Sequence, residues 1–204
     1  MFITFEGGEG AGKTTQISLL KQHLSESGYD VISTREPGGT LFGEQIRNWL
    51  LNPQGSAAFG YRTELLLFLA ARVQHLEELI LPALKAGKVV LCDRFNDSTV
   101  AYQGGARGLG ISSVQQLCDL ACNGISPDLT FFLDLAPEAG MSRIHRKHDR
   151  LESEGTAFHI KVREAFLTIA QNEPQRVHVI DATQSKQAVF SSIFQKVESF
   201  LNRP

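Results

Sequence analysis

A glycine-rich stretch near the N-terminus constrains the fold more than any other feature of the sequence. Residues 7–14 read Gly-Gly-Glu-Gly-Ala-Gly-Lys-Thr and fit the pattern G-x-x-x-x-G-K-[ST] at every fixed position. The stretch follows an apolar run at 2–5 and precedes a helical pattern with Ile17, Leu20 and Leu24 on one face. A strand, a glycine loop and a helix in this order predict a loop whose backbone N–H groups and helix N-terminus surround a phosphate group.

Strands and helices alternate along the rest of the chain. Further strands are expected at 29–34, 88–92, 129–135 and 177–180. Helices are expected at about 41–51, 63–85, 112–122, 137–147, 157–171 and 186–201, with Asn52-Pro53 and Gly55 separating the first two. This order predicts one α/β domain over residues 1–204, a parallel five-stranded sheet with helices on both faces. Ligands of such sheets collect at the carboxyl ends of the strands.

Composition excludes several classes of protein. The net charge is −2 and no charged tail stands out, so neither a nucleic-acid partner nor a membrane surface is expected. The three cysteines, Cys92, Cys118 and Cys122, form no C-x-x-C pair, which argues against a disulfide framework or a zinc site. With no signal peptide and no long apolar run, we expect a cytoplasmic protein.

The glycine loop predicts binding of ATP and Mg²⁺. Lys13 would reach the β- and γ-phosphates, and the Thr14 hydroxyl would bind Mg²⁺. Asp93 ends the predicted strand at 88–92 and would hold the same ion directly or through water, although it could instead form an ion pair with Arg94. The residues expected to contact ATP here are Gly7, Gly8, Glu9, Gly10, Ala11, Gly12, Lys13, Thr14 and Thr15.

Six segments resemble those of the thymidylate kinase family, and together they span almost the whole chain. The specific ones are EGGEGAGKT at 6–14, TREPGGT at 34–40, LFLAAR at 67–72 and DRFNDSTVAYQG at 93–104, with weaker matches at 149–152 and 181–183. The resemblance implies the P-loop nucleoside-monophosphate-kinase fold with a small lid, and phosphorylation of dTMP to dTDP by ATP with Mg²⁺. It also implies a homodimer.

The resemblance also implies roles for single residues, most of them in an acceptor-binding region at about 36–75 or in the segment 93–104. Phe68 would stack on the thymine ring, with Arg72, Thr99 and Gln103 hydrogen-bonding its edges. From the residues alone, Phe68 could as well belong to the core, because it lies in an apolar run.

Further implied roles concern the acceptor phosphate, the acceptor sugar and the adenine of ATP. Arg47, Arg94 and Ser98 would hold the phosphate of the acceptor, although Arg47 alone could be a solvated helix residue. Glu9 would approach the acceptor sugar, and Tyr102 would fill the space that a ribose 2′-hydroxyl would occupy. The adenine of ATP would lie beside Arg143, Asp181 and Thr183.

Basic residues crowd the segment before residue 151. Arg143, His145, Arg146, Lys147, His148 and Arg150 fall within eight positions, which favours a lid at about 142–157 over the ATP phosphates. The glycine loop contains no arginine, so the resemblance is to the bacterial type with its catalytic arginine in the lid. We expect Arg150 in that role and Arg146 as the second candidate, beside Lys13 and Arg94 as the other catalytic residues.

Three other functions are compatible with a phosphate loop. A kinase for another nucleoside monophosphate or for a small alcohol or acid would share the loop and lid but lack the 93–104 pattern. A guanine-nucleotide switch would carry N-K-x-D, which is absent from the sequence. A non-catalytic nucleotide-binding module has no need of Lys13, Thr14 and Asp93 together.

Overall fold

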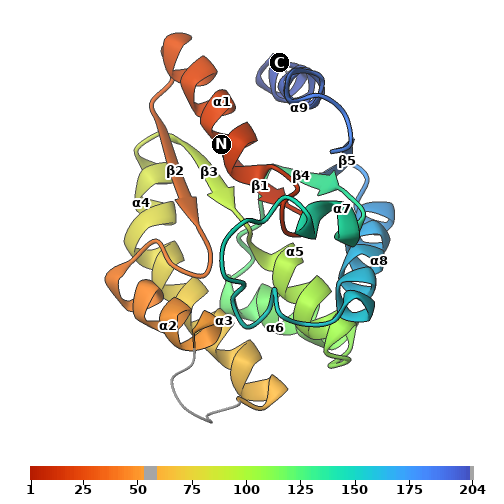
Figure 1. The fold of residues 1–204 in the computed structure, drawn as a ribbon. Coiled ribbons are helices and arrows are strands. Elements are labelled where there is room, and N and C mark those ends of the chain that lie inside the picture. Colours follow the sequence, from red (N-terminus) through yellow and green to blue (C-terminus); the bar gives the residue numbers. More distant parts are fainter. Residues whose placement is uncertain (53–58, 203–204) are drawn as a thin grey trace.

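A computed structural model describes residues 1–52 and 59–202 of the chain. Pro53 and Gly55, which were expected to separate two helices, lie outside the described residues. The described strands are β1 (Phe2–Glu6), β2 (Val31–Arg35), β3 (Val89–Asp93), β4 (Leu129–Asp134) and β5 (Val177–Asp181). They form a parallel five-stranded sheet in the order β2-β3-β1-β4-β5, as the sequence predicted (Figure 1).

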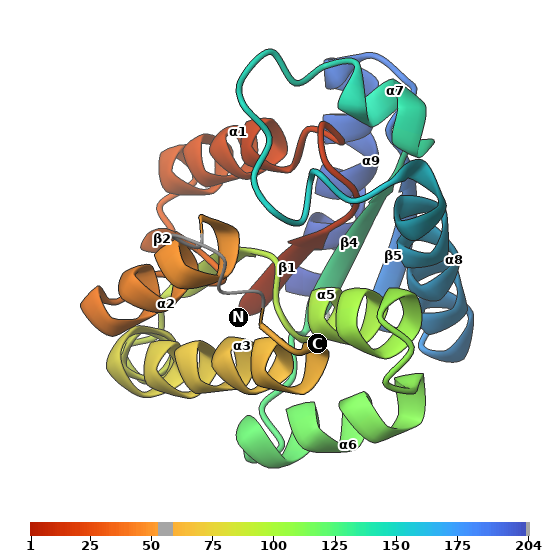
Figure 2. The same ribbon diagram turned by 60° about the horizontal axis from the view of Figure 1, so that its bottom comes forward.

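Helices connect the strands and cover both faces of the sheet. They are α1 (Lys13–Glu26), α2 (Leu41–Leu51), α3 (Tyr61–His75), η1 (Leu76–Ile80), α4 (Leu81–Lys85), α5 (Asn96–Thr99), η2 (Val100–Ala106), α6 (Ile111–Ala121), α7 (Pro137–Met141), α8 (Thr156–Asn172) and α9 (Lys186–Leu201). Helices α1 and α9 pack on one face, and α3, α5, α6 and α8 lie on the other (Figure 2).

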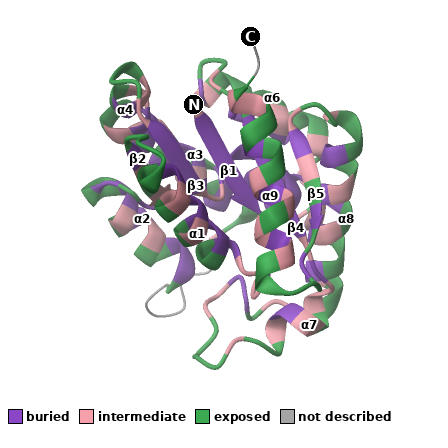
Figure 3. Ribbon diagram, turned by 90° about the horizontal axis from the view of Figure 1, so that it is seen from above, coloured by how far each residue is buried: buried purple, intermediate pink, exposed green. Residues whose placement is uncertain are grey.

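Alternating strand residues build the two halves of the core. Ile3 and Phe5 of β1 pack with Leu20 of α1 and Ile193 of α9, whereas Phe2 faces the other side of the sheet with Phe95. The three central strands, β1, β3 and β4, are therefore almost fully buried, whereas the edge strands β2 and β5 and the outer sides of the helices are partly exposed (Figure 3). Cys92, Cys118 and Cys122 are all buried and free.

One predicted helix is too long, and one helix of the structure was not predicted. The helix expected at 137–147 ends at Met141, because the residues that follow are charged and exposed and offer no apolar face for packing. The segment 96–106 forms a helix, α5 continued by the π-helical turns of η2, which the apolar pattern does not indicate. Every residue from 96 to 104 is buried although several are polar, so this helix has no amphipathic period.

None of the described helices combines the length and the apolar character needed to cross a membrane.

Candidate functional site

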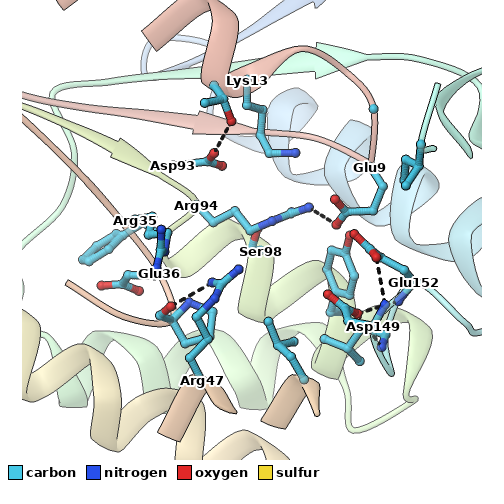
Figure 4. Close-up of a pocket in the computed structure, with 18 of the residues that line it drawn as sticks. Glu9, Lys13, Arg35, Glu36, Arg47, Asp93, Arg94, Ser98, Asp149 and Glu152 are labelled. Atoms are coloured by element: carbon cyan, nitrogen blue, oxygen red, sulfur yellow. Dashed lines mark hydrogen bonds and ion pairs between the residues drawn. The ribbon is translucent and has the colours of Figure 1, made fainter. Parts of the chain in front are cut away.

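A cleft of about 730 Å³ lies at the carboxyl edge of the sheet. Its walls come from the glycine loop, the loop after β2, helices α2 and α3, the helix 96–106 and the segment 143–152 (Figure 4). The predicted site residues that line it are Glu9, Gly10, Gly12, Lys13, Thr14, Thr15, Arg47, Phe68, Arg72, Asp93, Arg94, Ser98, Thr99, Tyr102, Gln103, Arg143 and Arg146. The structure therefore gathers the four sequence segments around one space.

The glycine loop is fixed by a close backbone approach. Gly10 has a φ of 68°, and a Cβ atom there would lie 2.1 Å from the carbonyl oxygen of Gly140 in α7. Lys13 folds back over the loop and donates to the carbonyl oxygens of Gly7 at 3.2 Å and Gly8 at 2.9 Å. Burial, and next the charge of Arg94, lower the pKa of Lys13, which marks a site built for a negative ligand.

Two side-chain oxygen atoms that could bind a metal ion lie together at the start of α1. The Thr14 hydroxyl donates to Asp93 Oδ2 at 3.3 Å, and both side chains line the cleft. Mg²⁺ takes oxygen ligands and is commonly held by one or two protein groups together with water and substrate phosphates. In the described part of the chain no group of three or more His, Cys, Asp or Glu side chains could hold a metal alone. The pair therefore fits Mg²⁺ that arrives with a phosphate.

Arg94 crosses the cleft rather than pairing with Asp93. Its guanidinium forms an ion pair with Glu9 of the glycine loop, donates to Ser98 Oγ at 3.1 Å, and lies 5.3 Å from the ring centre of Tyr102 (Figure 4). Burial alone would raise the pKa of Glu9, but the charges of Arg94 and Lys13 outweigh it and hold that pKa at about 2. Glu9 is thus ionised at neutral pH.

Two further arginines, Arg35 and Arg47, line the same cleft as Arg94. Arg47 donates to the carbonyl oxygen of Pro37 at 2.9 Å and is partly buried. Its pKa is lowered by burial and then by the positive charge of Arg35, with Arg94 adding to the effect. Several guanidinium groups held this close favour binding of an anion between them.

The deep end of the cleft holds an aromatic ring beside a buried arginine. Phe68 is half-buried, packs against the core and also lines the cleft, so the two readings of this residue are compatible. Arg72, one turn later, is buried and forms an ion pair with Glu36 at 2.6 Å. It also donates to the carbonyl oxygen of Phe95 at 3.1 Å and to Thr99 Oγ1 at 2.9 Å.

The basic segment divides into residues that line the cleft, Arg143, His145 and Arg146, and residues that do not, Lys147, His148 and Arg150. Arg143 donates to the carbonyl oxygen of Gly10 at 3.2 Å. Arg146 lines the cleft and forms a bidentate ion pair with Glu152, with N–O distances of 2.7 and 2.6 Å. Arg150 points away, donating to the carbonyl oxygen of Leu50 at 2.7 Å and pairing with Glu64 at 2.6 Å, and is not among the lining residues.

Some predicted ATP contacts lie outside the lining of the cleft. Asp181 and Thr183 form an exposed turn after β5, in which the backbone N–H and the hydroxyl of Thr183 both donate to Asp181. Gly7, Gly8 and Ala11 belong to the glycine loop without lining the cleft.

Comparison with known proteins gives the same family throughout. The thymidylate kinase family model matches residues 5–193. Thymidylate kinases of Protochlamydia amoebophila and Geobacillus sp. (strain WCH70) are 54% and 50% identical, over 98% and 93% of this chain and 91% and 92% of their own lengths. The chain belongs to the thymidylate kinase family. The crystal structure of thymidylate kinase from Ehrlichia chaffeensis superposes with a TM-score of 0.79 at 40% identity, covering 97% of this chain and 98% of that one.

Membership confirms the resemblance and the fold expected from the sequence. Thymidylate kinases are nucleoside monophosphate kinases that use ATP and phosphorylate dTMP to dTDP. This places the chain among enzymes and argues against a nucleotide switch or a non-catalytic module.

Some charged residues of this thymidylate kinase site had no predicted role, among them Glu6, Arg35 and Glu36. Arg35 and Glu36 line the cleft, and Glu6 lies beneath it at the end of β1. The sequence resemblance covers all three positions. The roles of Glu36 and Glu6 were missed because their partners lie far away in the sequence: Glu36 pairs with Arg72, and Glu6 accepts from the backbone N–H of Phe95.

Glu6 holds the turn that contains Arg94 through hydrogen bonds. The carboxylate accepts the backbone N–H of Phe95 at 2.7 Å and the hydroxyl of Ser98. Arg94 itself has a φ of 72°, in the left-handed region that an arginine seldom adopts. Burial, and then the charge of Asp97, raise the pKa of Glu6 to about 8.

The raised pKa of Glu6 predicts a specific pH dependence of stability. From about pH 5 to about pH 8 folded Glu6 keeps a proton that the unfolded chain releases, so its contribution to stability falls as the pH rises. Glu6→Gln, which cannot ionise, should flatten the curve of unfolding free energy against pH by up to about 1.4 kcal/mol per pH unit. Urea unfolding of both proteins across this range is the measurement, and parallel curves would contradict the assignment.

Proposed function

We propose that this protein transfers the γ-phosphoryl group of ATP to dTMP, with Mg²⁺, through the residues of the cleft. The observation that carries the proposal is the joining of two different sites in one space. A complete glycine loop lies at one end, and an arginine cluster with an aromatic base pocket lies at the other. A binding module for one nucleotide needs only the first of these.

The donor phosphates would lie in the glycine loop. Its backbone N–H groups and the N-terminus of α1 supply positive ends of dipoles, and Lys13 would exchange its carbonyl partners for the β- and γ-phosphates. Mg²⁺ held by Thr14 and Asp93 would neutralise phosphate charge and orient the donor. Thr15 and Arg143 extend the donor side, and Asp181 and Thr183 would flank the adenine.

The acceptor phosphate would lie between Arg47 and Arg94, near Ser98. The phosphate would compete with Glu9 for Arg94, which leaves the Glu9 carboxylate free to meet the acceptor sugar. Tyr102 is held beneath Arg94 and would fill the space beside C2′ of a deoxyribose.

The base would stack on Phe68 with its edges toward Arg72, Thr99 and Gln103. Arg72 has five N–H groups, and its Nε and both Nη2 hydrogens are directed to Glu36, Phe95 and Thr99. One Nη1 hydrogen is directed toward the Cys118 sulfur, at 3.8 Å. A single N–H remains for the ligand, which suits one carbonyl oxygen of the base.

The chemistry requires alignment and charge neutralisation rather than a general base. The acceptor oxygen belongs to an ionised phosphate, so no hydroxyl proton has to be removed before attack. Lys13 and Arg94 would hold the two phosphates at the meeting point of their sites, in a cleft whose walls limit access of water.

The segment at about 142–157 would act as the lid over the donor. We place Arg146 first as the arginine that neutralises charge in the transition state, because it faces the cleft whereas Arg150 is directed to Glu64 and Leu50. Asp149 and Glu152 hold the loop around Arg146, with the N–H of Asp149 donating to Glu152 at 2.9 Å.

The setting of the reaction follows the family. We place it in the cytoplasm, as expected from the sequence, and assign a homodimer on the family resemblance alone.

An assay of ADP release across nucleoside monophosphates tests the proposed function. With ATP and Mg²⁺, dTMP should give the highest kcat/KM among dTMP, dUMP, dCMP, dGMP and AMP. Lys13→Ala is the control, and it should abolish turnover while the circular dichroism spectrum stays unchanged. Preference for another monophosphate would overturn the acceptor assignment, and activity of Lys13→Ala within about threefold of the parent would overturn the donor assignment.

The two lid arginines predict different kinetic losses. Arg146→Ala should lower kcat at least about a hundredfold with a small change in KM, as expected for a cation used in the transition state. Arg150→Ala should lower kcat by less than about tenfold, since its guanidinium serves Glu64. The reverse order in steady-state kinetics would return the role to Arg150, and near-normal values for both would exclude the lid as the source of this charge.

A further inference from the structure

A buried carboxylate stands one helical turn before Phe68. Glu64, Phe68 and Arg72 follow one another at intervals of four residues on α3, but Glu64 is fully buried and does not line the cleft. Its Oε1 accepts from Gln103 Nε2 at 2.8 Å and from Arg107 Nε at 3.3 Å. Its Oε2 pairs with Arg150 at 2.6 Å.

Gln103 and the two arginines together favour the ionised form of Glu64. Burial alone would raise its pKa, but the hydrogen bond from Gln103 and the charge of Arg150, with Arg107 in addition, hold the pKa below its ordinary value. An ionised carboxylate only accepts hydrogen bonds.

The ionised state of Glu64 decides which way the Gln103 amide faces. Oxygen and nitrogen of a glutamine amide have the same shape, so their assignment depends on the partners. Only the NH₂ group of Gln103 can face a carboxylate. The carbonyl oxygen Oε1 is thereby turned from Glu64, and it accepts no hydrogen bond among the described residues, although Gln103 lines the base pocket.

We propose that Glu64 is a specificity-determining positioning residue, which fixes the Gln103 amide so that its oxygen selects a base bearing a ring N–H. This rests on the proposed function and extends it to a residue outside the cleft. Thymine and uracil carry a hydrogen at N3, whereas N3 of cytosine is an acceptor and would face the Gln103 oxygen unpaired. An unpaired buried acceptor costs about 1–3 kcal/mol.

Neutralising Glu64 should release this selection. In Glu64→Gln the new amide can donate to Gln103, which can then flip and present its NH₂ group to the pocket. The ratio of kcat/KM for dTMP to that for dCMP should fall by about tenfold or more. The double variant Glu64→Gln/Gln103→Glu again presents an acceptor to the base and should restore most of the ratio.

Glu154→Gln is the matched control. Glu154 pairs with the same Arg107 at 2.6 Å but forms no hydrogen bond with Gln103 among the described residues, so the dTMP to dCMP ratio of Glu154→Gln should stay within about twofold of the parent. If Glu64→Gln fails to fold, Glu64→Asp keeps the negative charge for the arginines. It shortens the side chain by one methylene and so withdraws the carboxylate from the Gln103 amide, and the same fall in the dTMP to dCMP ratio is expected.

The outcomes separate this inference from the proposed function. A parent that does not phosphorylate dTMP would refute the proposed function. A parent that prefers dTMP, with an unchanged ratio in folded Glu64→Gln or Glu64→Asp, would overturn the role of Glu64 alone. A general structural role would lower turnover of both nucleotides without changing their ratio.

Discussion

The ion pair between Glu9 and Arg94 joins the two halves of the cleft. Glu9 comes from the glycine loop after β1, and Arg94 comes from the turn after the neighbouring strand β3, so the sheet itself sets their separation. Glu6 fixes the same turn from below. Because the pair is largely removed from water, loss of either partner would leave an uncompensated charge. The pair thus holds the donor and acceptor sites in register before either nucleotide binds.

Other arginines in and around the site also have carboxylate partners. Arg72 has Glu36 as its partner, and Arg150 has Glu64. These carboxylates fix the direction of each guanidinium and limit the hydrogen bonds left for a ligand. In the proposed function, selectivity for the base depends on which hydrogen-bond donors and acceptors these carboxylates leave free.

The sequence predicted the fold and most of the site because these depend on local pattern. The glycine loop, the order of strands and helices and the 93–104 segment each occupy contiguous residues, and all five strands lie within two residues of their predicted ends. The direction of Arg150 could not be predicted, since its partner Glu64 is distant in sequence. The buried helix at 96–106 was not predicted for a related reason. It is packed on all sides and therefore lacks the amphipathic pattern that identifies a surface helix.

Binding of dTMP and of thymidine to Arg94→Met measures the central claim most directly, namely that Arg94 is held ready for the acceptor phosphate. The two ligands differ only in that phosphate. Isothermal titration should show dTMP affinity reduced about tenfold or more by the substitution, as expected for a lost charge-assisted hydrogen bond, with thymidine affinity changed by less than about threefold. Equal losses for both ligands would contradict the account, because Arg94 would then support the cleft without binding the phosphate.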